Sequence, residues 1–543
     1  MFAISSLPTR IFARVALLLC LAVPLGFGAL ALALGQDANW DLRNYHWYNP
    51  YAFLTGRLHT DFAASTPYNP ALDVPLYLGA TLLSAKVFSF ILGTIHGLNY
   101  VLLYLLSRAV LAPLAEPRRT WSAAAIAIVG IVGGGHIGLV GTSFHDNVVS
   151  LAVIGAMLIV VSAPADVFRG MSRSAYVRVG LAGLLLGVGV GLKQPTITFA
   201  VGLCFAFLLA GGTFWRRMFL AFWFGIGITT GIGLSCGFWM LHLWREYQNP
   251  LFPYFNNIFK SPLGLNAANR DMAYVPKTLL DAAIFPLRFS FESRRVGEIE
   301  FRDLRILGAY LVLLATPIIF YSRRAAAAVI PAVDGVAARY VIAAAALSYV
   351  VWVPLFGIYR YIIPLEMLAP LAAVAAIALW PMSLRLRATI AGALLVLVTV
   401  TAQPGNWIRL PAWTEKMIEV SVPPLPADTM VLLVGLEPLS YVIPSLPPAI
   451  PVVRLQGYFT DPKDDTGVNR VIRARIKAHQ RPFYLLFAAW DRNTVDVVLP
   501  QFGLSGDFSA CGEVTSNVRP PPEDAMKISL CPVTPAGADP GHP

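Results

Sequence analysis

Long apolar stretches recur along most of the chain and are separated by short polar turns. A helix that crosses the bilayer core of about 30 Å needs roughly 20 apolar residues. The first stretch follows Arg10 and Arg14 as a signal peptide would, but its apolar run is too long for one, so we expect a retained helix. Eleven stretches are predicted to span the membrane, near residues 12–35, 86–113, 121–141, 147–163, 179–193, 195–213, 218–241, 305–321, 340–357, 362–380 and 388–403.

Arginine residues fall in alternate turns between the predicted spans. Arg118 and Arg119 follow the second span, and Arg216 and Arg217 follow the sixth. Because basic residues in short loops are retained in the cytoplasm, the alternation predicts a cytoplasmic N-terminus and an exported, periplasmic C-terminus in a bacterial inner membrane. The other arginines in these predicted cytoplasmic turns are Arg169, Arg173, Arg178, Arg323, Arg324, Arg339, Arg385 and Arg387.

Composition agrees with this pattern and excludes two classes of protein. Hydrophobic residues make up 57% of the chain and charged residues only 13%, whereas soluble domains carry about 25% charged residues. A soluble enzyme and a disordered protein are therefore excluded. The net charge is +11, and the predicted cytoplasmic segments hold fourteen arginines against three acids, Glu116, Asp166 and Asp334. That difference equals the whole net charge. The excess of basic residues therefore indicates the orientation of the chain in the membrane and does not indicate a nucleic-acid partner.

Three long segments fall on the predicted exported side, at residues 36–85, 242–304 and 404–543. The first two are loops of a transmembrane module that covers residues 1–403. The third is predicted to form a separate exported domain. The expected fold is therefore an all-α polytopic membrane protein with about eleven transmembrane helices and a small C-terminal α/β domain.

The C-terminal segment differs from the rest of the chain in its pattern of apolar and polar residues. Residues 404–428 are rich in Pro and Trp and suit a linker or an interfacial crossing. Residues 429–435 and 483–488 are short apolar runs typical of buried strands, and residues 466–480 have the pattern of an amphipathic helix. These elements predict the α/β domain.

Five cysteines divide between the two regions. Cys20, Cys204 and Cys236 lie inside predicted spans and are expected to be packing residues. Cys511 and Cys531 lie in the exported domain, where an oxidising compartment favours a disulfide between them. Two free thiols are the alternative.

The first exported loop carries an unusual set of polar residues, in the sequence QDANWDLRNYHWYNPYAFLTGRLHTDF. Trp and Tyr concentrate at membrane interfaces, so an interfacial helix explains the aromatic residues. It does not explain Asp37 and Asp41, which gain nothing from lying against lipid. A carboxylate at the mouth of a membrane cavity can act as a general base towards a hydroxyl group.

The spacing Asp41-Leu-Arg-Asn-Tyr45, followed by Gly56, resembles the motif of the GT-C superfamily of polyprenyl-phosphate-dependent glycosyltransferases. The chain resembles glycosyltransferase family 87 and related bacterial branches most closely. The resemblance covers about 400 residues of the membrane half. It implies an inverting transfer of a sugar from a polyprenyl phosphate to a glycolipid, polysaccharide or protein acceptor, with Asp41 as the base, Asp37 as its rival, and Tyr45 and His46 at the substrate.

Many members of this superfamily begin the motif with two adjacent acids. Trp40 stands beside Asp41 here, so a divalent metal bridged by such a pair is possible but not indicated. We therefore predict no cofactor. The expected partners are the lipid-linked sugar donor, its acceptor and the membrane lipids.

Other exported turns hold candidates for contacts with the sugar and the phosphate. His145 and Asp146 begin a predicted span, where they would cap the helix or contact the substrate. Their spacing does not indicate a zinc site. Lys193 and Arg360 break the charge pattern of the exported side, so they either snorkel to the interface or bind the lipid phosphate. Glu366 lies inside a span, where a carboxylate needs a partner, and the sequence does not identify one.

The second exported loop ends in FESRRVGEIEFRDLR, residues 291–305. Alternating charges predict a solvated amphipathic helix on the membrane surface. The alternative is a lid over the cavity from which Arg302 or Arg305 reaches the lipid phosphate.

Two other functions share these features. A transporter or flippase for lipid-linked sugars would place its polar sites at the bilayer midplane, often in repeated halves, whereas the unusual polar residues here gather at one face. An oligosaccharide ligase or polymerase that uses a lipid diphosphate would depend on exported Arg and His residues, with Asp41 dispensable. The short cytoplasmic turns disfavour a nucleotide-sugar donor.

Overall fold

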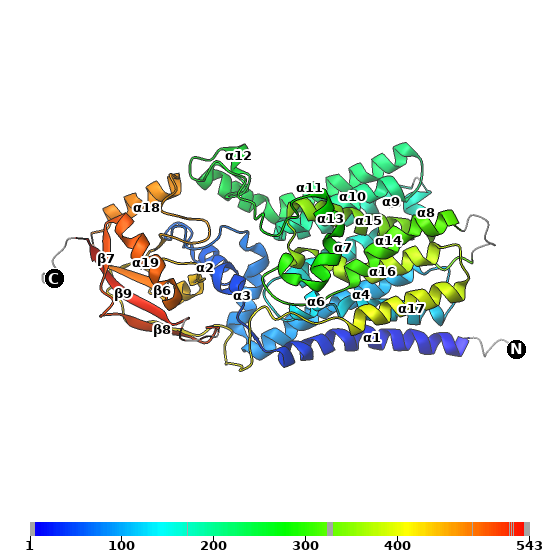
Figure 1. Ribbon diagram of the computed structural model, residues 1–543, viewed down its shortest axis with the longest axis horizontal. Helices are drawn as coiled ribbons and strands as arrows, with labels where there is room; N and C mark the ends of the chain where they lie inside the picture. Colours follow the sequence, from blue (N-terminus) through cyan, green and yellow to red (C-terminus); the bar gives the residue numbers. More distant parts are fainter. Residues whose placement is uncertain are drawn as a thin grey trace. The chain divides into compact units, whose positions relative to one another are not determined.

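A computed structural model describes residues 6–170, 172–322, 330–480, 482–520, 522, 524 and 526–536 (Figure 1). Arg323 and Arg324, which the sequence places in a cytoplasmic turn, lie outside these residues. The chain forms two compact units. The helical unit consists of residues 1–33, 89–237 and 271–407, and the mixed unit consists of residues 34–88, 238–270 and 408–543.

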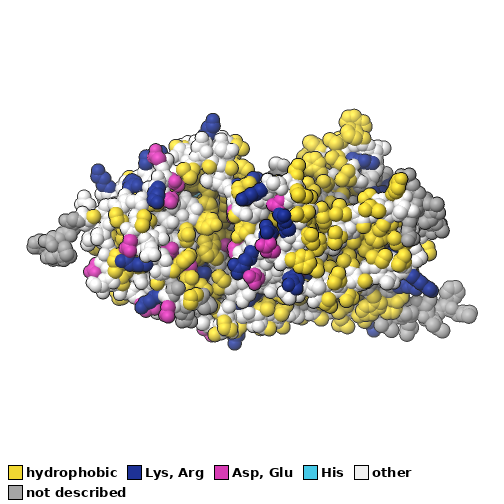
Figure 2. Space-filling view, in the orientation of Figure 1, with side chains coloured by type: hydrophobic (Ala, Val, Ile, Leu, Met, Phe, Trp, Pro, Cys, Tyr) yellow, Lys and Arg dark blue, Asp and Glu magenta, His cyan; other side chains and the backbone are white. Residues whose placement is uncertain are grey.

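Helices that match the predicted spans build the helical unit. Seven described helices are long and apolar enough to cross a membrane by length and composition, and two more, Asp146–Val161 and Gln194–Ala210, are apolar but shorter. Figure 2 shows hydrophobic side chains over the visible face of these helices, as a multi-pass membrane protein requires. The larger helices are α1 (Ser6–Leu34), α4 (Ala85–Val110), α5 (Arg118–Ile131), α7 (Asp146–Val161), α9 (Arg173–Leu192), α10 (Ile197–Ala210), α11 (Phe214–Tyr247), α13 (Leu279–Phe291), α14 (Arg305–Ser322), α15 (Gly335–Leu355), α16 (Ile363–Leu379) and α17 (Leu384–Val400).

Each of the eleven predicted stretches contains a helix, but the third is not continuous. Helix α5 ends at Ile131, and the short helix α6 (Gly134–Gly138) begins after a break. The buried carboxylate of Glu366 accepts hydrogen bonds there from the backbone N–H groups of Gly135 (3.0 Å) and His136 (2.9 Å). A Cβ on Gly133 would lie 1.8 Å from Glu366 Oε1, so only glycine leaves room for this carboxylate. The predicted stretch 121–141 is therefore not one continuous helix. The carboxylate of Glu366, for which the sequence identifies no partner, has backbone partners at this break.

Glycines also set the spacing between α9 and α11. A Cβ on Gly183 or Gly187 would lie 2.2 Å from a carbonyl oxygen of α11, and one on Gly227 or Gly231 would lie 2.3 Å from a carbonyl oxygen of α9. The two backbones touch along these four positions, as small residues permit between membrane helices. These four glycines therefore serve the close packing of α9 and α11.

Several arginines in the predicted cytoplasmic turns cap the ends of neighbouring helices. Arg119 donates to the carbonyl of Arg108 at the end of α4 (2.9 Å), and Arg339 donates to the carbonyl of Ala210 at the end of α10 (2.9 Å). Arg217 donates to Leu208 in α10 (3.0 Å). The last carbonyls of a helix have no partner within it, and a cation there also stabilises the helix dipole. These arginines therefore contribute to packing as well as to orientation.

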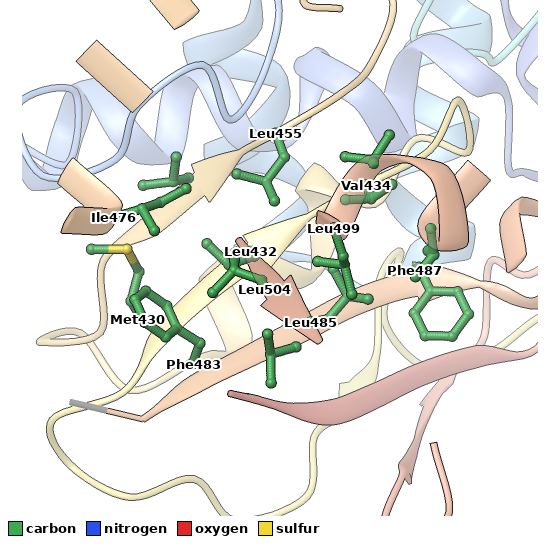
Figure 3. Close-up of a cluster of buried hydrophobic side chains, with 14 of the residues drawn as sticks. Met430, Leu432, Val434, Leu455, Ile476, Phe483, Leu485, Phe487, Leu499 and Leu504 are labelled. Atoms are coloured by element: carbon green, nitrogen blue, oxygen red, sulfur yellow. The ribbon is translucent and has the colours of Figure 1, made fainter. Parts of the chain in front are cut away.

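A sheet forms the core of the mixed unit. Strands β4 (Met430–Leu433), β5 (Val452–Arg454) and β6 (Phe483–Ala488) are parallel, with β4 in the middle, and the full order is β3-β8-β9-β6-β4-β5, with β7 on β9. Leu432, Leu455 and Leu485 are fully buried in the core (Figure 3). The other elements are β1 (Gln36–Asp37), β2 (Arg409–Leu410), β3 (Val420–Ser421), β7 (Leu504–Gly506), β8 (Gly512–Ser516), β9 (Ile528–Pro535), α2 (Tyr48–Thr55), α3 (Asp73–Leu82), α12 (Asn256–Phe259), α18 (Gly467–Ala478) and α19 (Arg492–Val498).

The two predicted strands and the amphipathic helix correspond to β4, β6 and α18. The segment 404–428, expected as a linker, contributes strands instead: β2 pairs with β1, and β3 pairs with β8. The first loop that the sequence predicts to be exported also reaches the sheet, because Phe62 N–H donates to Val452 O (2.9 Å) and Arg454 N–H donates to Phe62 O (3.1 Å). Backbone pairing thus joins the loop to the C-terminal residues in one unit.

A buried ion pair strengthens this junction. Arg57 makes two hydrogen bonds to the carboxylate of Asp61, at 2.8 and 2.7 Å, and donates to the carbonyls of Pro448 and Ile450. Asp61 also accepts from the backbone N–H of Val452 (2.9 Å). Both charged groups are therefore satisfied at the edge of the sheet.

Cys511 and Cys531 form a disulfide with a sequence separation of 20 residues. Closing a loop of this length restricts the unfolded chain, so the double variant Cys511→Ser/Cys531→Ser is expected to lose about 3 kcal/mol of stability in the mixed unit. Thermal unfolding of the full chain with and without reductant measures this loss. Cys20→Ser is the control, because Cys20 is a free thiol. An equal loss of stability in that variant would show that the loss does not come from the disulfide.

Candidate functional site

The motif residues lie at the start of a helix in the mixed unit. Asp41 precedes a π-helical turn, Leu42–His46, which leads into α2. Single π-helical turns are rare and occur frequently at functional sites. Asp41 is 8% exposed, whereas Asp37 is fully buried. Both candidate bases are therefore buried, Asp37 completely and Asp41 nearly so.

Local hydrogen bonds hold the carboxylate of Asp37. It accepts from the backbone N–H of Asn39 (3.1 Å) and from the Asn39 side chain (2.7 and 2.9 Å). Asn39 Oδ1 in turn accepts from the backbone N–H of Leu42 (2.8 Å). Asp37 thus fixes the turn that starts the helix carrying Asp41.

Tyr45 and His46 lie among aromatic side chains. The Tyr45 ring packs 4.3 Å from the His46 ring and 4.7 Å from the Tyr68 ring, measured between centroids. The Nδ1 atom of His46 lies 2.6 Å from Asp73 Oδ1, and both side chains are buried. His46 is therefore held by a carboxylate, while Tyr45 is half-buried beside the motif.

A cavity of about 280 Å³ lies in the mixed unit beside this motif. Trp40 and Asn44, on either side of Asp41 in the sequence, contribute to its lining. The loop Gly435–Pro438, which follows β4, and Arg454, which ends β5, contribute from the sheet. Ligands of open α/β sheets bind at the carboxyl ends of the strands where the chain connections diverge. The other polar and aromatic residues of the lining include Phe62, Ser65, Thr66, Tyr247, Phe252, Tyr458, Phe459, Asp461 and Asp464.

Buried charges fix the cavity wall. Arg43, inside the motif, forms a buried ion pair with Glu437 of the lining. Burial lowers the pKa of Arg43 to about 10. Burial likewise lowers the pKa of Arg454 to about 10, against the opposing effect of Asp491. The ion pair joins the motif directly to the loop after β4.

Asp491, which follows β6, holds that loop from the other side. Its carboxylate accepts from the backbone N–H groups of Leu436 and Glu437, each at 3.1 Å. Burial raises the pKa of Asp491. A Cβ on Gly435, which has φ +111°, would lie 2.2 Å from Asp491 Oδ2, so the loop requires glycine here. The sequence signal that could have identified this loop is Gly-Leu-Glu-Pro directly after a buried strand.

The helical unit contains a second cluster, around Phe144 and Tyr361. Lys193 Nζ lies 2.8 Å from Asp146 Oδ1 and also donates to the carbonyl of Phe144. The guanidinium of Arg360 lies 4.1 Å from the centre of the Phe144 ring. Both cations face the Tyr361 ring, at 5.9 and 6.0 Å. The structure therefore brings together two of the residues that the sequence proposes as phosphate ligands.

The residues at the start of α7 differ from the expectation of a cap. His145 is the N-cap residue, with φ 63°, and makes no side-chain capping bond to the helix. Asp146 is the first helical residue, and its carboxylate faces Lys193. The left-handed conformation of His145 turns the chain so that this ion pair replaces a capping bond.

The charged segment after α13 is not an amphipathic helix. Helix α13 ends at Phe291, and only one helical turn, Ser293–Arg295, follows. The Ser293 hydroxyl donates to Ile299 O and accepts from Phe301 N–H, both at 3.0 Å, which bends the segment back on itself. Arg302 is exposed, and its backbone pairs with Gln403. The prediction of a surface helix is wrong because these local bonds compete with it.

No family model and no curated protein matches the chain. Among solved structures, the chain is similar to the oligosaccharyltransferase of Archaeoglobus fulgidus in its apo form, with a TM-score of 0.42 and 11% sequence identity. The similarity covers 90% of this chain and 73% of that chain. At this level of similarity, the functional assignment depends on the residues of the chain itself.

Proposed function

We propose that this protein is an integral-membrane inverting glycosyltransferase of the GT-C superfamily, which moves a sugar from a polyprenyl-phosphate donor to an acceptor on the exported face of a bacterial inner membrane. The observation that carries the proposal is the position of the Asp41–Tyr45 motif beside a cavity of the mixed unit. Trp40 and Asn44 line this cavity, and Arg43 pairs with Glu437 in its wall.

Asp41 is the proposed general base. The acceptor hydroxyl oxygen forms a bond to the sugar C1 as the bond from C1 to the phosphate oxygen breaks. The hydroxyl proton moves to Asp41, and polyprenyl phosphate leaves with the electron pair. Attack opposite the leaving group inverts the configuration at C1. Asp37 is the weaker candidate because the Asn39 amide groups already occupy its fully buried carboxylate.

Lys193 and Arg360 are the proposed ligands of the donor phosphate. The leaving phosphate gains negative charge as the C1–O bond breaks, so nearby cations stabilise the transition state more than the bound donor. Arg360 is the better placed of the two. Its ion-pair partner Glu298 is 3.8 Å away and half exposed, whereas Lys193 is held by the buried Asp146.

The cavity of the mixed unit is the proposed acceptor site, and its lining suits a carbohydrate. Trp40 and Tyr458 offer rings for stacking against the apolar faces of a sugar. Asn44, Asp461 and Asp464 offer hydrogen-bonding groups for its hydroxyls. Convergent polar groups beside aromatic side chains in a cavity are typical of small-ligand sites.

The proposal is tested with the full chain in membrane vesicles that are supplied with a panel of radiolabelled polyprenyl-phosphate sugars and a membrane extract as acceptor source. The expected result is transfer of label from one donor, with release of polyprenyl phosphate in equal amount. Lipid-linked sugar that crosses the membrane without cleavage of the C1–O bond would instead indicate a flippase and contradict the proposal.

Arg360→Ala is expected to lower kcat/KM for the donor by about ten- to a hundred-fold, because it removes one charge-assisted contact to the phosphate. Glu298→Gln is the matched control, since it removes the partner of Arg360 and leaves the cation in place. Steady-state transfer rates over a range of donor concentrations measure both variants. Equal rates for Arg360→Ala and the unmodified protein would exclude Arg360 as a phosphate ligand.

A further inference from the structure

A second cavity, of about 600 Å³, lies in the helical unit at the end where α11 begins. Three arginines, Arg169, Arg216 and Arg339, are among the residues that line it. Its lining, as far as the structure describes it, includes no acid. The arginine pattern of the sequence places this end in the cytoplasm. The cavity lining is therefore cationic. None of its residues is assigned a role in the proposed transfer reaction.

The cavity opens at the first turn of α11. The loop Gly211–Thr213 lines the cavity immediately before this helix, which runs over 34 residues. The first N–H groups of a helix have no acceptor within it, and the helix dipole adds positive potential there. A helix N-terminus with such surroundings binds phosphate groups readily.

Arg216 provides an independent sign of a missing ligand. Its side chain is 7% exposed, and its Nε and Nη2 atoms donate to the carbonyls of Asp166 and Val167. Its Nη1 atom is buried and has no hydrogen-bond partner among the described residues. A buried guanidinium group normally has all of its N–H groups bonded. Arg216 lines the cavity, so an anion bound there would lie beside this guanidinium group.

Apolar side chains adjoin these charges. Trp215 and Phe219 line the same cavity and are 79% and 52% exposed. Phe214 and Phe222 continue this exposed apolar surface along α11. A soluble phosphate compound would gain nothing from these side chains, whereas acyl chains would cover them. Trp residues also favour the depth of lipid headgroups.

We propose that this cavity binds the phosphate headgroup of an anionic phospholipid of the cytoplasmic leaflet. The phosphate lies at the N-terminus of α11, where Arg169, Arg216 and Arg339 surround it. The acyl chains run along Trp215, Phe219 and Phe222. Basic cavities between membrane helices bind anionic headgroups by the same combination of charge and apolar contact.

The test measures lipid binding and does not depend on transferase activity. Full-length protein in detergent is titrated with phosphatidylglycerol or with phosphatidylcholine of the same acyl chains, and bound lipid is counted by native mass spectrometry. We expect one molecule of phosphatidylglycerol to bind more tightly than phosphatidylcholine. We also expect phosphatidylglycerol, but not phosphatidylcholine, to raise the unfolding temperature of the protein. Equal binding of the two lipids would overturn the proposal.

Variants locate the binding site. Arg169→Gln is expected to weaken phosphatidylglycerol binding about five-fold, as removal of one cation near an anionic lipid implies. Arg385→Gln is the matched control, since Arg385 is an exposed arginine that does not line the cavity. Arg216→Ala is less informative alone because it also removes the bonds to the carbonyls of Asp166 and Val167. Equal weakening by Arg169→Gln and Arg385→Gln would show general attraction to the basic face and would overturn the proposal.

Soluble anions distinguish the source of the phosphate. Inorganic phosphate and glycerol 3-phosphate are added at the same concentrations as the lipid, with the unfolding temperature as the readout. We expect neither to match phosphatidylglycerol, because neither reaches Trp215 and Phe219. Equal stabilisation by either one would show a site for soluble phosphate compounds and would contradict the lipid assignment.

Discussion

Asp41→Asn is expected to lower the rate of sugar transfer about 10²- to 10⁴-fold, which is the contribution of a positioned general base. The amide cannot take up the proton of the acceptor hydroxyl as a carboxylate does, yet it preserves the size and shape of the side chain. The folded structure should therefore remain. Label transfer in vesicles, with protein levels matched by quantification of the full-length chain, measures the effect.

Asp37→Asn is the comparison that separates the two carboxylates. Asp37 orders the turn through Asn39, so its replacement should lower stability more than the rate measured for protein that remains folded. A larger rate loss in Asp37→Asn than in Asp41→Asn would transfer the role of base to Asp37. Full transfer by Asp41→Asn, together with loss in Arg360→Ala, would favour a lipid-diphosphate ligase instead.

Asp61→Asn is expected to destabilise the mixed unit by about 3–5 kcal/mol, because it leaves the charge of Arg57 buried without its partner. The Arg57 and Asp61 side chains are only 5% and 1% exposed. The carboxylate of Asp61 also accepts from the Tyr48 hydroxyl (2.8 Å) and from the backbone of Val452. Chemical denaturation of the full chain, followed by protease digestion of the mixed unit, measures the change.

Asp496→Asn provides a matched control on the surface of the same unit. Asp496 pairs with Arg492 at the same spacing of four residues, but these side chains are 54% and 38% exposed. Exposed pairs contribute little to stability, so this variant should unfold at nearly the same denaturant concentration as the unmodified protein. Similar losses for Asp61→Asn and Asp496→Asn would show that burial of the Arg57–Asp61 pair does not matter.

The helices were predictable because lipid demands long apolar runs, and the structure has a helix in every predicted stretch. The break between α5 and α6 was not predictable from hydropathy alone. It depends on the contact of Glu366 with Gly135, which lies 231 residues away in the sequence. A glycine triplet suggests either close packing or an interruption, and only the distant carboxylate distinguishes them.

Individual site residues were easier to predict than their grouping. Lys193 and Arg360 stood out as cations on the predicted exported side, but their common neighbours Phe144 and Tyr361 carry no signal of their own. Arg43 lies inside the motif, yet its partner Glu437 is 394 residues away. The cavity was missed because three distant chain segments line it, and the pattern of any one of them does not predict the other two.

The pairing of Phe62 with the strand at Val453 has a consequence for biosynthesis. Arg57 bonds to Pro448, 391 residues later in the chain, so the first loop leaves the ribosome long before its partners exist. Contacts of such long sequence separation form slowly. During translation, the first loop would hold the charges of Arg57 and Asp61 without its strand partner until helix α17 and strand β5 have been made. Completion of the mixed unit is thus a late step, which requires nearly the whole chain to have been made. A polypeptide truncated before residue 448 would leave this loop exposed to chaperones and proteases.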